Sequence, residues 1–161
     1  MATGQVSSLT GDNWQLIATN TPTSGTSTSF TSLSGYNKFR LICSNLAFGG
    51  SADLLCRFNS DSGSNYIGSA SGWSSATSNA WSTAATLGGN SNTNHYAFID
   101  IENVDKTFPK KIQGAWGDQA NGYGDVINGI YIGSSAITSI SLQDSSGNTI
   151  SGGTVYLYGL A

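Results

Sequence analysis

The stretch KFRLICSNLAFGGSADLLCRFN, residues 38–59, carries the clearest fold signal in the chain. Apolar and polar residues alternate on both sides of the central AFGGSA, which is the period-two pattern of half-buried β-strands. Folding the stretch about that loop places Cys43 opposite Cys56 and leaves Arg40 and Arg57 on the other face. We therefore predict a hairpin whose buried face consists of Phe39, Leu41, Cys43, Cys56 and Phe58.

The two cysteines are expected to be buried thiols that fill core space. They lack the C-x-x-C spacing of a metal or redox site. A disulfide stays open as an alternative, although a cytoplasmic origin disfavours it. That origin is expected because MATGQVSSLTGDNW has no basic region followed by an apolar run, and no segment is long enough for a membrane span.

Short alternating segments separated by turn residues recur along the whole chain. They predict a single all-β domain over residues 14–161, an antiparallel β-sandwich or jelly roll, after an N-terminal arm at 1–13. A second hairpin is expected around SSGN, with Val155 and Leu157 inward and Tyr156 and Tyr158 outward. The predicted strands, about nine, span 14–19, 29–33, 38–46, 53–59, 95–104, 110–116, 126–132, 136–142 and 154–160.

Charge is scarce, since 9% of the 161 residues are charged against a typical value of about 25%. Only six residues are basic, and the adjacent pair Lys110 and Lys111 is interpreted as a solvated strand end. A nucleic-acid partner is excluded on this basis, because duplex binding needs clustered Lys and Arg.

The sequence offers little for catalysis, and we predict that the protein is not an enzyme and needs no cofactor. The single histidine, His95, opens an apolar strand, and no G-x-S-x-G motif accompanies it. Asp100 and Glu102 share one face of that strand, but same-face acids on a strand are usually solvent-facing. Cys43 and Cys56 are assigned to the core and so do not supply a nucleophile.

The segment RFNSDSGSNY, residues 57–66, resembles a calcium loop, with Asn59, Asp61 and Asn65 as weak metal candidates. The segment QDSSGNT, residues 143–149, has nearly the same order of Asp, Ser, Gly and Asn. Two calcium sites with one carboxylate each would be a coincidence. Two hairpin turns, with Asp or Asn bonded to nearby backbone and Gly at a positive φ, are favoured instead.

The interval 62–94 is long, polar and rich in Gly and Ser. It either holds irregular short strands or is a functional excursion whose aromatic residues meet a partner. Aromatic side chains dominate interface centres and also stack on sugars. The interaction candidates are Trp73, Trp81, Tyr66 and Tyr123.

Several motifs together resemble a family of small virion proteins of tailed bacteriophages. The chain has a Trp-containing first strand, NWQLIATNT, then SFTSLSGYNKFRLICSNL, LLCRFNSDSGSNY and a final GTVYLYGLA. The interval from Trp73 to Asn94 has no counterpart. The matching residues are Trp14, Phe30, Leu33, Tyr36, Leu55, Arg57, Phe58, Asp61, Gly63, Tyr66, Gly153, Thr154, Leu157, Tyr158 and Gly159.

The resemblance implies a virion protein with a β-sandwich fold, and with the expected cytoplasmic origin it would be made in the host cytoplasm. We expect a capsid decoration or cement protein that bridges neighbouring subunits, because this chain has little beyond one domain and a short arm. The expected partners are the major capsid protein and copies of itself, as a homotrimer. The alternative is a tail or fibre protein that binds a receptor such as a host surface glycan.

Overall fold

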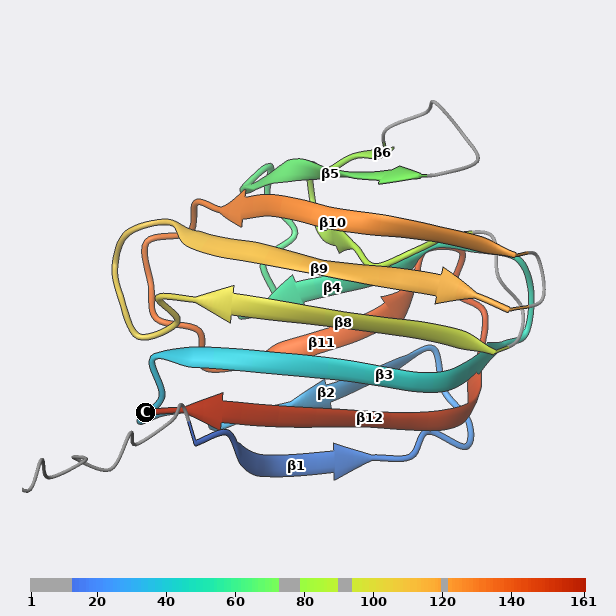
Figure 1. Ribbon diagram of the computed structural model, residues 1–161, viewed down its shortest axis with the longest axis horizontal. Helices are drawn as coiled ribbons and strands as arrows, with labels where there is room; N and C mark the ends of the chain where they lie inside the picture. The colour runs from blue at the N-terminus through green and yellow to red at the C-terminus, as the bar shows by residue number, and fades with distance from the viewer. Residues whose placement is uncertain (1–12, 73–78, 90–93, 120–121) are drawn as a thin grey trace, which may run out of the picture.

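A computed structural model of the protein describes residues 13–72, 79–89, 94–119 and 122–161. Two antiparallel sheets pack face to face in a sandwich-like all-β arrangement (Figure 1). The larger sheet has the strand order β1-β12-β3-β8-β9-β10-β5-β6, and the smaller has the order β2-β11-β4-β7. The larger sheet comprises β1 (Gln15–Asn20), β3 (Lys38–Phe48), β5 (Tyr66–Gly72), β6 (Asn79–Ala80), β8 (His95–Glu102), β9 (Lys110–Asp118), β10 (Tyr123–Tyr131) and β12 (Ile150–Leu160). The smaller comprises β2 (Ser27–Phe30), β4 (Leu54–Phe58), β7 (Ala85–Thr86) and β11 (Ile140–Asp144).

The described residues form twelve strands, so the prediction of about nine was too low. Each predicted segment overlaps an observed strand. The three additional strands, β5, β6 and β7, all lie in the interval 62–94, and two of them are only two residues long. The described part of this interval is therefore built from short strands. The predicted N-terminal arm lies outside the described residues except for Asn13.

Both predicted hairpins are wrong, although the predicted buried faces are right. β3 pairs with β12 and β8, whereas β4 pairs with β11 and β7 in the other sheet. β11 and β12 are likewise in different sheets. The loops that look like hairpin turns cross from one sheet to the other. Alternation specifies which side chains of a strand are buried. It does not specify the sheet, because strands of both sheets in a sandwich show the same alternation of buried and exposed residues.

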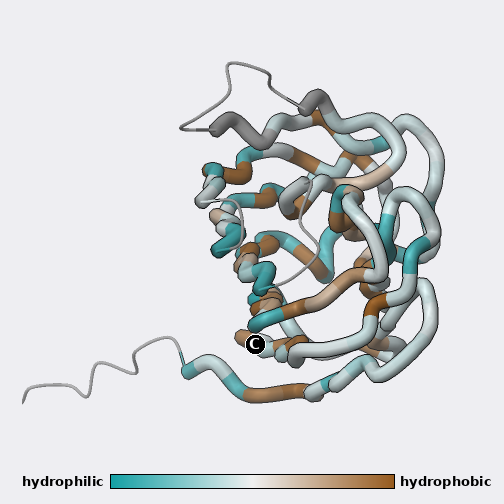
Figure 2. Tube along the Cα trace, turned by 90° about the vertical axis from the view of Figure 1, so that its right-hand side faces the viewer, coloured by the Kyte–Doolittle hydropathy of each residue, from teal (hydrophilic) through white to brown (hydrophobic). Residues whose placement is uncertain are grey.

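The core lies between the sheets and has the predicted composition. Leu41, Cys56 and Phe58 are fully buried, as are Val155 and Leu157 from the other predicted pair. Figure 2 shows hydrophobic and hydrophilic residues interleaved along the chain, as strands with one buried face require.

Both cysteines are free and buried, so the expected buried thiols are confirmed and they form no disulfide. Burial raises the pKa of Cys43 to about 12. It also raises the pKa of Cys56, with the nearby Cys43 adding to the rise.

Glycines on the inner face of the larger sheet make room for the core's largest side chain. A Cβ at Gly68 or Gly129 would collide with the indole ring of Trp81. Gly114 stands against the backbone carbonyl of Phe98 on the neighbouring strand, so a side chain there would strike main chain. Only Gly fits at these positions, because a larger residue would prevent the close approach of the Trp81 ring or of the neighbouring backbone.

The two Asp-containing segments are turns built on side-chain bonds to nearby backbone, as predicted, but they are not hairpin turns, because each crosses from the smaller sheet to the larger. Asp61 accepts a hydrogen bond from the Gly63 N–H at 2.8 Å. Asp144 accepts bonds from the N–H groups of Ser146 and Asn148 at 2.8 and 3.0 Å. Gly147 has the expected positive φ of 74°. In the first turn, the positive φ values fall on Asn59 and Ser60 instead of on a glycine.

The pair of lysines was only half correctly interpreted. Lys111 is exposed, but Lys110 is buried, with its side chain on the inner face of β9. The Lys110 Nζ donates to the carbonyl oxygen of Gly133 at 2.7 Å and lies 5.8 Å from the centre of the Tyr131 ring. Burial lowers the pKa of Lys110. A buried ammonium needs such partners, and the alternation of the strand gave no sign of them.

Candidate binding face

The outer face of the larger sheet carries two rows of side chains that run across its strands. The outer apolar row follows the register Tyr156, Ile42, Phe98, Ala115 and Val126, on strands β12, β3, β8, β9 and β10. The outer polar row follows the neighbouring register Tyr158, Arg40, Asp100, Gln113, Asn128 and Ser69. Residues two apart on a strand share a face, so the two rows lie side by side.

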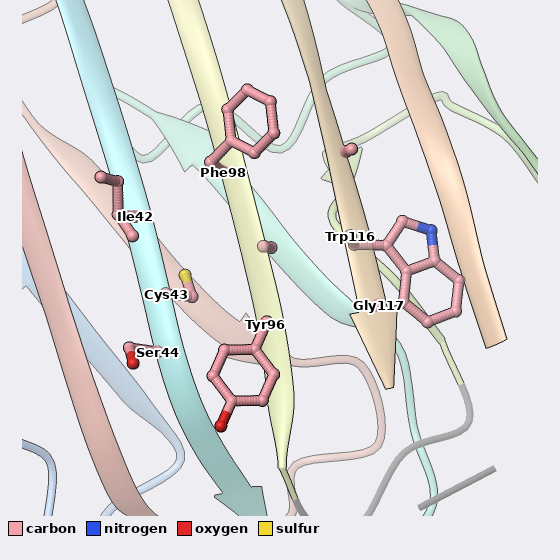
Figure 3. Close-up of a pocket in the computed structure, with 9 residues that line it drawn as sticks. Ile42, Cys43, Ser44, Tyr96, Phe98, Trp116 and Gly117 are labelled. Carbon is pink, nitrogen blue, oxygen red and sulfur yellow. The ribbon is translucent and has the colours of Figure 1, made fainter. Parts of the chain in front are cut away.

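The apolar row is unusually exposed for its residue types, and it borders a shallow hollow. In this row Phe98 is 45% exposed and Val126 is 55% exposed, and Tyr96, two residues before Phe98 on the same face of β8, is 44% exposed. The hollow has a volume of about 290 Å³ and crosses strands β3, β8 and β9. Figure 3 shows Tyr96 and Phe98 projecting from β8 on either side of it, next to the small residues of β9. Small side chains at Ala115 and Gly117 leave this space open.

The polar row is held in place by a charged pair. Arg40 donates to both oxygens of Asp100, with Nε and Nη2 each at 2.6 Å, which is the two-pronged geometry of strong guanidinium–carboxylate pairs. The indole ring of Trp14 lies 4.7 Å from the guanidinium carbon. The hydrogen bond to Asp100 raises the pKa of Arg40, against the opposing effect of burial. Further along, Lys38 lies 3.8 Å from Glu102.

The residues that could have supplied catalysis are not assembled into a reactive group. Asp100 and Glu102 lie on the outer face, as expected, and they are paired with Arg40 and Lys38, which was not predicted. His95 is buried on the inner face, where its Nε2–H donates to the carbonyl oxygen of Leu87 at 2.9 Å and its ring stacks on Trp116. Burial lowers the pKa of His95.

Two of the weak calcium candidates, Asn59 and Asp61, accept hydrogen bonds from neighbouring residues through their side-chain oxygens. Asp61 Oδ2 accepts from the Asn65 amide at 2.8 Å and from the Tyr131 hydroxyl at 2.9 Å. Asn59 Oδ1 accepts from the N–H of Thr138 at 2.8 Å. The bonds from Asn65 and from the Gly63 N–H lower the pKa of Asp61. Among the described residues, no three His, Cys, Asp or Glu side chains gather in a group able to hold a metal.

Of the three predicted interaction residues that the structure describes, two are buried. Tyr66 and Trp81 are 1% and 6% exposed, so both side chains belong to the core, and neither is available to a partner. Tyr123 is 44% exposed at the start of β10. Trp73 lies outside the described residues. The error arose because the glycines that accommodate Trp81 are distant from it in the sequence.

The sequence contained a signal for the aromatic residues that were missed. In HYAFIDIE, residues 95–102, both alternating sets contain apolar residues, because Tyr96 and Phe98 occupy positions that a half-buried strand normally gives to polar residues. Such a strand in a two-layer fold predicts an exposed apolar surface.

The described residues contain no helix that is long and apolar enough to cross a bilayer. The chain matches no known family model, and no curated protein matches its sequence.

Proposed function

We propose that this protein is a non-enzymatic binding module of a bacteriophage virion, and that the outer face of its larger sheet attaches it to carbohydrate on the host surface. The observation that carries the proposal is the hollow lined by Tyr96 and Phe98, with the outer polar row following on the other side of Phe98. The virion setting rests on the family resemblance.

The strand order supports a jelly-roll architecture for this module. If β5, β6, β9 and β10 are set aside, eight strands remain. In chain order they pair first with last, second with seventh, third with sixth and fourth with fifth: β1 with β12, β2 with β11, β3 with β8 and β4 with β7. One long hairpin rolled into two sheets has this pairing, and it is the arrangement of a jelly roll. The four strands set aside include β9 and β10, which widen the larger sheet and hold part of the proposed binding face.

Carbohydrate suits this face because a sugar has two kinds of surface. Its C–H groups form an apolar patch that packs on aromatic rings such as Phe98 and Tyr96. Its hydroxyl groups need donors and acceptors, and guanidinium, carboxylate and amide groups supply both. The outer face places Arg40, Asp100 and Gln113 directly beside the aromatic residues.

The test is binding of the purified protein to an array of surface glycans, with the Phe98→Ala variant alongside. We expect binding to at least one glycan class, and a marked loss in the variant with no change in thermal unfolding. Binding that survives in Phe98→Ala and Tyr96→Ala would place the site elsewhere. Cleavage of a polysaccharide would contradict the non-enzymatic role.

Capsid decoration is a second candidate, favoured by a separate apolar corner of the same face. Ile67 and Ile130 are direct neighbours across β5 and β10, and they are 54% and 37% exposed. Two adjacent exposed isoleucines suit a protein partner, here the major capsid protein or another copy of the chain in a trimer. A standard interface buries about 1,600 Å².

Copy number separates the two candidates. If the protein binds receptors, gel densitometry of purified virions should give a copy number per virion that matches the symmetry of the tail. A number that scales with the subunits of the head would favour decoration. In that case Ile130→Asp should release the protein from the virion, whereas Phe98→Ala should not.

A further inference from the structure

We propose that the outer apolar and outer polar rows together form an extended site for an unbranched, uncharged oligosaccharide that lies across strands β12 to β10. The inference rests on the proposed function and specifies its ligand. It follows from three properties of the face: the direction of the rows, the side chains available to hydroxyl groups and the balance of charge.

The direction of the rows sets the shape of the ligand. The outer apolar row passes over four gaps between neighbouring strands, from Tyr156 on β12 to Val126 on β10. At 4.7–4.9 Å for each gap, it is about 19 Å long, the length of a short oligosaccharide. A chain of rings lying along it would keep its apolar side on the row throughout.

The hollow sets the position of one sugar ring. Tyr96 and Phe98 lie two residues apart on one face of β8, which separates their Cα atoms by about 7 Å. Beside them, Ala115 and Gly117 on β9 line the hollow with small side chains. One ring fits there with an aromatic side chain at either edge, and these two walls leave little width for a branch.

The polar row supplies partners for hydroxyl groups along the same length. Arg40 uses Nε and Nη2 on Asp100, which leaves three of its five N–H donors for a ligand. Its position is fixed in advance by Asp100 and by the ring of Trp14, so little ordering entropy is lost on binding. The amides of Gln113 and Asn128 continue the row, and each offers both a donor and an acceptor.

The charges on the face favour an uncharged ligand. Arg40 is neutralised by Asp100, and Lys38 lies beside Glu102. The exposed Lys111 of β9 adds one positive charge to this face, beyond the polar row and away from the hollow. The whole chain carries a net charge of -3, which repels anionic sugars at long range. A neutral chain makes the same stacking contacts and hydrogen bonds without that repulsion.

The experiment uses the full chain and an array of unbranched neutral and anionic oligosaccharides of increasing length, followed by calorimetric titration of the tightest neutral binder. We expect affinity to rise with length until the row is filled and then to level off. Phe98→Ala should weaken binding by about tenfold or more, the scale of a buried aromatic anchor. Gln113→Ala and Asn128→Ala should weaken it less.

Phe108→Ala is the matched control, because Phe108 is 52% exposed in the connection between β8 and β9 and belongs to neither row. It should bind as the unaltered chain does. Thermal unfolding of every variant checks that the fold is retained.

The possible failures are distinguishable. Binding of anionic or branched glycans alone, abolished by Phe98→Ala, would overturn the extended neutral site but leave the carbohydrate-binding function in place. Binding that does not depend on length would limit the site to the hollow and would also overturn this inference. No binding to any glycan would overturn both proposals and leave capsid decoration.

Discussion

The two faces of strand β8 use one stretch of sequence for different purposes. On the inner face, Ala97 is 5% exposed and Ile99 and Ile101 are completely buried. On the outer face, Phe98 is about half exposed and Asp100 is held by Arg40. Neighbouring residues therefore either pack in the core or lie on the proposed binding face. This separation allows the binding face to be altered with little effect on folding.

The sharpest test of this separation is a pair of adjacent substitutions on β8. Ile99→Ala should lower the free energy of unfolding by about 2–5 kcal/mol, because it leaves a cavity in a fully packed core. Phe98→Ala, one residue away, should lower it by less than about 1 kcal/mol, since its ring is already about half in solvent. Urea denaturation measures both. Equal losses would show that Phe98 is part of the core and would break the comparison.

A second test concerns the inner-face glycines. Gly114→Ala should destabilise the protein by about 3 kcal/mol, the upper end of the range for overpacking, because the added methyl group meets the backbone carbonyl of Phe98. Gly152→Ala on β12 is the control, since the nearest atom to its added methyl group is the Ala47 Cβ at 3.5 Å. A small effect of Gly114→Ala on the thermal unfolding midpoint would mean that β8 and β9 can separate locally.

The inner face also holds the only histidine, whose titration should be visible in stability. Burial lowers the pKa of His95 in the folded state, below the ordinary value of about 6.5. The unfolded chain therefore takes up a proton first as the pH falls. Stability should be unaffected by this group above about pH 7 and should fall below 6.5 by at most about 1.4 kcal/mol per pH unit.

Denaturation curves collected between pH 7.5 and 5, a window chosen about the ordinary pKa of histidine, check this expectation. The slope should be shallower in His95→Gln. An unchanged slope in that variant would assign the pH dependence to the carboxylates instead.

The smallest effect is expected for the ion pair of the outer face. Arg40 and Asp100 are partly exposed, with side-chain exposures of 36% and 19%, so solvent screens their attraction. A double-mutant cycle with Arg40→Ala and Asp100→Ala should give a coupling of about 0.2–1 kcal/mol in stability. The same variants should weaken ligand binding by more than they affect folding. A coupling of several kcal/mol would mean that the pair has a structural role.

Much of the fold could be predicted from alternation, whereas the pairing of strands could not. Leu41, Cys43 and Phe58 were assigned correctly to the core because their period-two pattern specifies a face. Their strands were assigned to one hairpin because AFGGSA resembles a turn, and a turn residue does not encode whether the chain returns within a sheet or crosses to another. β5 was missed because YIGSASG has few large apolar residues.

The candidate site was the weakest prediction for a related reason. Trp81 and Tyr66 were chosen as exposed aromatics within a polar interval, but their burial depends on Gly68 and Gly129 and on a shared aromatic cluster with Phe58 and Tyr131. Such contacts are tertiary and leave no local pattern. Tyr96 and Phe98 were the residues whose local pattern was informative.

The two buried cysteines can report on transient separation of the two sheets. Only a thiolate reacts readily with alkylating reagents, and burial keeps Cys43 and Cys56 protonated as well as shielded from reagent. Because they project from opposite sheets into one core, labelling either requires the two layers to part. The rate of thiol labelling in native buffer therefore measures how often the two sheets separate. This measurement needs no engineered label site.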